Sequence, residues 1–115
     1  VDTSIDITEP VYVEMTFAKY GIIFGLISAA SSLTHPNLFY ESVTQNNLTG
    51  TLVSFSYNPH TGAYLIKKDN VLLVSGTTTA DTTARIALYH FDYVRQTDVT
   101  LNAGASPFVY TPEYP

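Results

Sequence analysis

Alternating apolar and polar residues predict a strand near the start of the chain. In VYVEMTF, residues 11–17, every second residue is apolar and would lie on one side of an extended backbone, whereas Tyr12, Glu14 and Thr16 would lie on the other. This period of two is typical of a half-buried strand. We therefore predict that one face of this strand packs in a core.

The next apolar segment, IIFGLIS at residues 22–28, is apolar on both faces and fits either a central strand or a short buried helix. Its β-branched residues and Gly25 favour the strand. Turn formers dominate the chain that follows, where Pro36 biases His35 away from helical geometry. There we predict a loop with one short strand at Leu38–Val43.

Two turn signals predict hairpins in the middle of the chain. The segment NPHTG, at Asn58–Gly62, combines a proline of preset φ with a glycine that can take positive φ, as a four- or five-residue hairpin loop requires. The pair Asp69-Asn70 tolerates the left-handed conformation of a two-residue turn. The strands predicted around these turns begin at Thr51 and cover Ala63–Lys68 and Val71–Ser75.

A polar connector, GTTTADTT, leads into ARIALYHFDYV at residues 84–94. Ala87 and Tyr89 would share one face of an extended chain, and Ile86 and Leu88 the other. Because both faces carry apolar residues, both should be covered, and we predict that this segment is the central strand of the sheet.

The two ends of the chain lack this periodicity. Residues 1–9 are mostly polar, and residues 107–115 contain three prolines, which interrupt a sheet ladder or a helix. We predict a single all-β domain, sandwich-like or barrel-like, with a core at residues 10–106 and an extended arm at each end. The apolar residues of these arms are our candidates for binding a partner: Ile5, Ile7, Phe108, Tyr110 and Tyr114. A lone monomer would leave those of the C-terminal arm in water.

Composition narrows the classes of function. At 115 residues the chain has room for one core, and its 13% of charged residues is about half the usual share. Ten acidic and five basic residues give a net charge of −5, and the basic residues never form a run longer than two. We therefore expect no nucleic-acid binding. We also expect no membrane span, because the densest apolar stretch is too short.

Candidate chemistry is sparse. The chain has no cysteine. His90 and Asp92 are two apart on a predicted strand and could hold a metal side by side, with Asp98, His60 or His35 as a third ligand. Nothing in the spacing makes these residues converge, so we predict no enzymatic activity, no cofactor and no metal. Asn47 begins a glycosylation sequon that matters only on a secretory route.

Nine tyrosines and six phenylalanines are the unusual part of the composition. Aromatic residues gather in small β cores and at protein contacts, where tyrosine offers apolar area with a polar tip. A carbohydrate-binding β-sandwich, with Tyr89 or Tyr93 in an exposed row, is a second reading. A third is a filament subunit joined by strand exchange.

The order of segments from Thr51 to Ser106 resembles a known family. YNPHTGAYLIKKDN, VLLVSG, TTADTTARIALYHFDYVRQTDVTL and NAGAS follow one another as in the head-decoration, or capsid-cementing, proteins of lambda-like tailed phages. The resemblance implies a β-tulip-like fold and a trimer on the capsid surface of a virion, with the major capsid protein as partner. It also implies an N-terminal arm that adds a strand to that partner.

Overall fold

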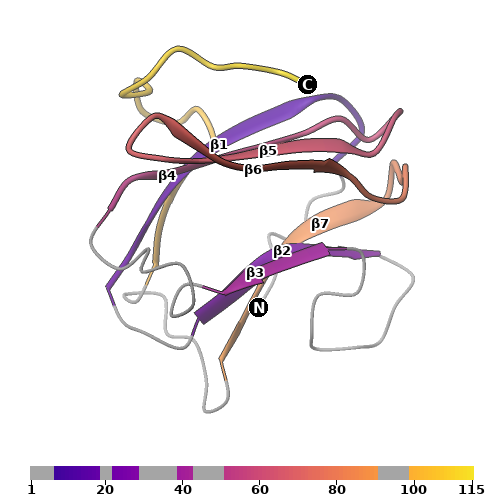
Figure 1. Ribbon diagram of the computed structural model, residues 1–115, viewed down its shortest axis with the longest axis horizontal. Helices are drawn as coiled ribbons and strands as arrows, with labels where there is room; N and C mark the ends of the chain where they lie inside the picture. The colour runs from indigo at the N-terminus through magenta and orange to yellow at the C-terminus, as the bar shows by residue number, and fades with distance from the viewer. Residues whose placement is uncertain (1–6, 19–21, 29–38, 43–50, 91–98) are drawn as a thin grey trace.

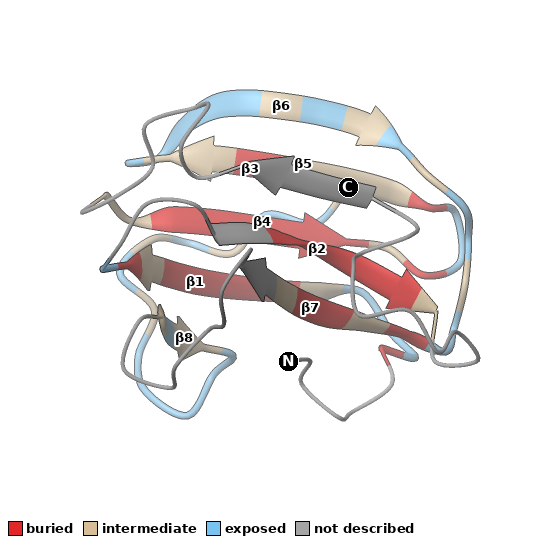
Figure 2. Ribbon diagram, turned by 90° about the horizontal axis from the view of Figure 1, so that it is seen from below, coloured by how far each residue is buried: buried red, intermediate tan, exposed pale blue. Residues whose placement is uncertain are grey.

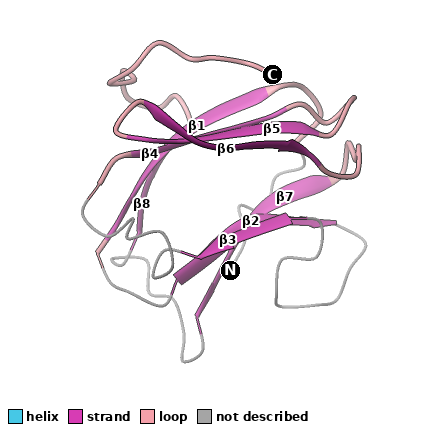
Figure 3. Ribbon diagram, viewed as in Figure 1, coloured by secondary structure: helices cyan, strands magenta, loops and turns pink. Residues whose placement is uncertain are grey.

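The computed structural model describes residues 7–18, 22–28, 39–42, 51–90 and 99–115. These residues form eight strands and no helix (Figure 3). The strands make two antiparallel sheets, which lie as two layers in Figure 1. The five-stranded sheet has the order β6 (Val71–Thr77), β5 (Ala63–Lys68), β4 (Val53–Tyr57), β1 (Val11–Phe17), β8 (Val99–Asn102), and the three-stranded sheet the order β3 (Phe39–Ser42), β2 (Ile22–Ser28), β7 (Ala84–His90). The predicted all-β single domain is confirmed.

One hydrophobic core joins the two sheets, and buried residues lie along the middle of both layers in Figure 2. Phe24 of β2 stacks on Phe17 of β1 at 5.6 Å between ring centroids and meets Phe55 of β4 edge-on at 6.0 Å. These rings are fully buried and connect the layers. The molecule is therefore a β-sandwich, with the odd-numbered residues of β1 and β4 on its inner faces.

Both predicted hairpin turns are confirmed. The N–H of Gly62 donates to the carbonyl of Asn58 at 2.8 Å, and Gly62 has φ +82°. Asp69 and Asn70 have φ of 48° and 67°, so both central residues of the β5–β6 turn are left-handed. That conformation matches the right-handed twist of the two strands it joins.

The prediction that residues 84–94 form the central strand is wrong for the order of the described strands, in which β2 is the middle strand of its sheet. β7 begins at Ala84 and is last in the order of its sheet, with β2 as its neighbour among the described residues. Ile86 and Ala87 are nevertheless both buried, on opposite faces. A strand can be covered on both faces without having a neighbouring strand along both edges. For this reason, the apolar residues on both faces of residues 84–90 did not identify the middle strand. Residues 91–94 lie outside the described residues.

The second face of β1 also differs from the expectation. Tyr12 and Glu14, on the side away from the core, are only 5% and 4% exposed. The reason is that residues 107–115 cross this face; in Figure 1 they run as a yellow chain on the side of the five-stranded sheet away from β2 and β7. We call residues 107–115 the C-terminal segment, and the covered side the outer face.

Candidate functional site

The C-terminal segment is held on the outer face by side chains rather than by a strand ladder. The ring of Phe108 meets Tyr12 of β1 edge-on, with centroids 4.8 Å apart. Further along, the hydroxyl of Ser56 on β4 donates to the carbonyl of Glu113 at 2.6 Å, and the ammonium of Lys67 on β5 pairs with the Glu113 carboxylate. The segment therefore spans three strands of the sheet.

Glu14 of β1 accepts two hydrogen bonds from the C-terminal segment. Its Oε1 accepts from the N–H of Val109 at 2.8 Å, and its Oε2 accepts from the N–H of Tyr110 at 3.0 Å. The hydroxyl of Tyr12 also donates to Oε2, at 2.8 Å. One buried carboxylate thus satisfies two backbone donors that no strand pairing would satisfy, which fixes the middle of the C-terminal segment.

The environment of Glu14 keeps it ionised. Burial raises the pKa of this carboxyl, but the hydrogen bonds donated by Tyr110, Val109 and Tyr12 favour the anion, and the net pKa lies below its ordinary value. Burial and the neighbouring Glu14 raise the pKa of Tyr12, which stays protonated and keeps donating. The pair is suited to holding the chain in place, because neither group is poised to exchange a proton near neutral pH.

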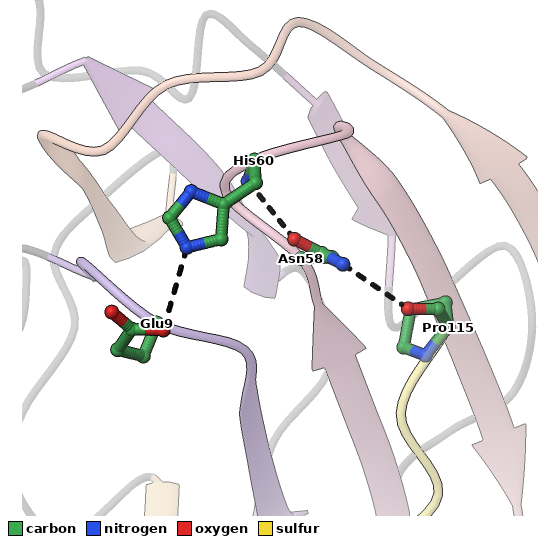
Figure 4. A network of polar contacts seen from close by, with 4 residues as sticks. All are labelled: Glu9, Asn58, His60 and Pro115. Carbon is green, nitrogen blue, oxygen red and sulfur yellow. Dashed lines mark hydrogen bonds and ion pairs between the residues drawn. The ribbon is translucent and has the colours of Figure 1, made fainter.

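The loop of the first hairpin contacts segments from both ends of the described chain (Figure 4). The side-chain amide of Asn58 donates to the carbonyl of Pro115 at 3.3 Å, and its oxygen accepts from the N–H of His60 at 2.9 Å. The His60 ring lies 3.4 Å from the carboxylate of Glu9, and both side chains are at least half exposed. This last contact is therefore a weak surface pair.

A second feature is the exposed edge of the five-stranded sheet. Val71, Leu72 and Leu73 on β6 are 69%, 56% and 36% exposed, and we call these three residues the β6 strip. The register passes from Ile66 opposite Val74 to Lys67 opposite Leu72, so Leu73 is the additional residue of a β-bulge. The other large apolar residues that are exposed within the described ranges are Val109 and Tyr114.

The predicted partner-binding residues have different environments. Ile5 lies outside the described residues. Ile7 is buried in the core, and its N–H donates to the carbonyl of Ala84 at 2.8 Å. Phe108 and Tyr110 are half-buried by their contacts with the outer face, and Tyr114 is 55% exposed. Ile7 is therefore not exposed to a partner. The expectation that the C-terminal arm leaves its apolar residues in water holds for Tyr114 but only in part for Phe108 and Tyr110.

The sequence also carried a signal that we missed. VLLV at the start of β6 is a run of four apolar residues directly after a tight turn. Such a run on a strand with a solvated face has to expose some of its members. It identifies the β6 strip more directly than the composition of the arms does.

The candidate metal ligands are not brought together in the described part of the chain. His35, Asp92 and Asp98 lie outside it, as does the side chain of His90. Among the described residues, no three histidine or acidic side chains form a group that could hold a metal ion. The gap under the C-terminal segment, lined by Tyr12, Lys67 and neighbouring side chains, leaves no room for a bound small molecule.

Within the described ranges, no helix is long and apolar enough to cross a membrane. In comparisons with known proteins, no family model matches the sequence, and neither a curated protein nor a solved structure matches the chain.

Proposed function

We propose that the protein is a non-enzymatic structural subunit that binds and stabilises a phage capsid shell, and that the C-terminal segment is its contact with the major capsid protein. The observation that carries the proposal is that this segment is fixed from below by Glu14 while it exposes Val109 and Tyr114, by 69% and 55%, to a partner. The resemblance of residues 51–106 to head-decoration proteins supports a capsid shell as the structure to which the protein binds.

A fixed segment is a favourable binding element. Association costs free energy for every side chain and backbone segment that it orders. The hydrogen bonds to Glu14 and the ring contact of Phe108 with Tyr12 order this segment before any partner arrives. Apolar contacts made by Val109 and Tyr114 therefore contribute to affinity without that cost.

The test is co-sedimentation of the purified protein with capsids of the virus that encodes it, followed by electron microscopy. We expect the wild type to decorate the shell and Val109→Lys to lose retention, because a charge would be buried at the contact. Thr100→Lys, at an exposed position of β8, should retain binding. Retention of Val109→Lys at the wild-type level would refute the role of the segment.

A filament subunit is the alternative that the exposed β6 edge favours, since an uncovered strand can accept a strand from a neighbour. The same micrographs separate the two functions. Open polymers of the purified protein would support a filament and contradict a shell-bound subunit.

A further inference from the structure

We propose that the outer face is also a binding site for the C-terminal segment of a second copy, so that two molecules dimerise by exchanging residues 107–115. Each copy then makes with its neighbour the contacts that one chain makes within itself in the structure. Exchange of an identical element is a low-cost route to a dimer, because no new complementary surface is needed. The site lies below the segment and is distinct from the proposed shell contact, which Val109 and Tyr114 make above it.

The structure shows both the site and its ligand. Glu14 on β1 accepts hydrogen bonds from two successive N–H groups of the segment, and Ser56 on β4 donates to the carbonyl of Glu113 at 2.6 Å. Lys67 on β5 forms an ion pair with Glu113. The binding groups therefore lie on the five-stranded sheet, whereas the groups that they bind lie on the segment. A second copy carries the same segment and can make the same contacts.

The outer face can be uncovered without opening the core. Most of the sheet side chains that line the gap under the segment carry polar groups, and Leu65 is the apolar one. The polar ones are Tyr12, Ser54, Ser56, Lys67 and Asn70. Water can hydrate these groups while the site is empty, in contrast to the apolar core between the sheets. The segment can therefore leave one outer face and bind another while the sandwich stays folded.

The connection between β8 and the segment is placed to act as a hinge. β8 is last in the order of its sheet, and among the described strands none lies beyond it. Residues 103–106 are exposed and span at most about 14 Å when fully extended. Asn102, at the end of β8, is aligned with Glu14, and the segment returns over Glu14. An opened loop instead leads the segment outward, past this edge of the sheet and toward a neighbour.

The side chain of Asn102 holds the hinge closed. Its oxygen accepts from the N–H groups of Gly104 and Ser106 at 2.9 and 3.2 Å, and its NH₂ group donates to the carbonyls of Ser106 and Pro107 at 3.1 and 3.4 Å. Gly104 has a φ of +116°, a conformation that favours glycine. These contacts are local and exposed. Because exchange removes them and keeps the contacts with the outer face, they set the balance between the closed monomer and the dimer.

Two variants of the full chain with opposite charge changes test the proposal. Lys67→Glu and Glu113→Lys each place like charges at the ion pair, both within one chain and in a dimer of that variant. In a mixture of the two, an exchanged dimer brings opposite charges together at both sites. Analytical ultracentrifugation should therefore show that the mixture dimerises at least about tenfold more tightly than either variant alone. A mixture that dimerises no more tightly than its components would overturn the proposal.

Two further variants separate the hinge from the binding site. Asn102→Ala removes hydrogen bonds of the closed form alone, so it should tighten dimerisation by at least about fivefold. Ser56→Ala is the matched control, because it removes a hydrogen bond that is present in both forms, and it should leave dimerisation unchanged. Circular dichroism verifies that each variant is folded.

Equal dimerisation of Asn102→Ala and Ser56→Ala would contradict the role of the hinge and overturn the proposal. So would a wild type and an Asn102→Ala variant that both stay monomeric up to about 1 mM, the range of the weakest specific complexes. Neither outcome bears on shell binding, which requires only that Val109 and Tyr114 stay exposed on the segment.

Discussion

Replacing Glu14 with glutamine should detach the C-terminal segment from the outer face. The carboxylate uses both oxygens to accept three hydrogen bonds, from the N–H groups of Val109 and Tyr110 and from the hydroxyl of Tyr12. A glutamine side chain has one oxygen and an NH₂ group. Whichever way it is oriented, the NH₂ group faces at least one N–H donor, and that donor loses its acceptor.

The size of the effect follows from these contacts. Hydrogen bonds to a charged group contribute about 1.5–3 kcal/mol each, and a buried donor left without an acceptor costs about 1–3 kcal/mol. Glu14→Gln keeps the bonds on one oxygen in weaker, neutral form and loses those on the other. We therefore expect a loss of about 2–3 kcal/mol, a large part of the stability of a small domain.

Chemical denaturation and amide hydrogen exchange measure the two parts of this prediction. In the variant, the free energy of unfolding should fall, and the amides of Val109 and Tyr110 should lose their protection. Glu9→Gln makes the same chemical change at a side chain that is 80% exposed, and it should change stability by less than about 0.5 kcal/mol. If Glu14→Gln matched Glu9→Gln in stability and in exchange, the attachment by Glu14 would be refuted.

Acid should reproduce the effect of the substitution. The pKa of Glu14 is lowered in the folded protein from its ordinary value of 4.5. The unfolded chain therefore takes up a proton first as the pH falls. The stabilisation is complete above pH 4.5 and is lost as the pH falls through the folded pKa. The difference in stability between wild type and Glu14→Gln should accordingly shrink at low pH, since a protonated glutamate resembles glutamine.

Three further substitutions test the turns and the C-terminal segment by chemical denaturation. Gly62→Ala should cost more than about 2 kcal/mol, because its Cβ would lie 2.0 Å from the carbonyl oxygen of Thr78 at a φ of +82°; a loss below about 0.5 kcal/mol would contradict the close approach. Asn70→Ala should cost about 1 kcal/mol at its φ of 67°, and Asn70→Gly should be neutral or stabilising, so equal effects would argue against the left-handed turn. Phe108→Ala should cost about 1–2 kcal/mol by removing the edge-on contact with Tyr12, and no loss would mean that this ring does not anchor the segment.

The strands and turns were predictable because their determinants are local. The bounds of β1 and β2 are those expected from the alternation in VYVEMTF and from the apolar run IIFGLIS. The turn at Asp69-Asn70 follows from the ability of these two residues to adopt positive φ. In each case the residues that decide the structure lie within a few positions of one another.

The outer face was not predictable in the same way. Glu14 stands in the polar half of an alternating strand, as a solvated surface glutamate would, and nothing nearby in the sequence distinguishes the two. Its partners are 95 and 96 residues later in the chain. Strand order is equally hard to predict from the sequence. The burial of Ile86 and Ala87 shows that both faces of β7 are covered, but it does not show which strands lie next to β7.

The separation of Glu14 from its partners also has a kinetic consequence. Contacts between distant parts of a chain form only after a large loop has closed, and folding slows as such contacts increase. Until residues 109 and 110 arrive, the carboxylate must keep its water, because burying it alone would be very costly. We therefore expect the core between the two sheets to form first. The outer face should lose its bound water only later, when the C-terminal segment docks on it. A folding intermediate of this protein would be nearly complete in its core and still open along β1.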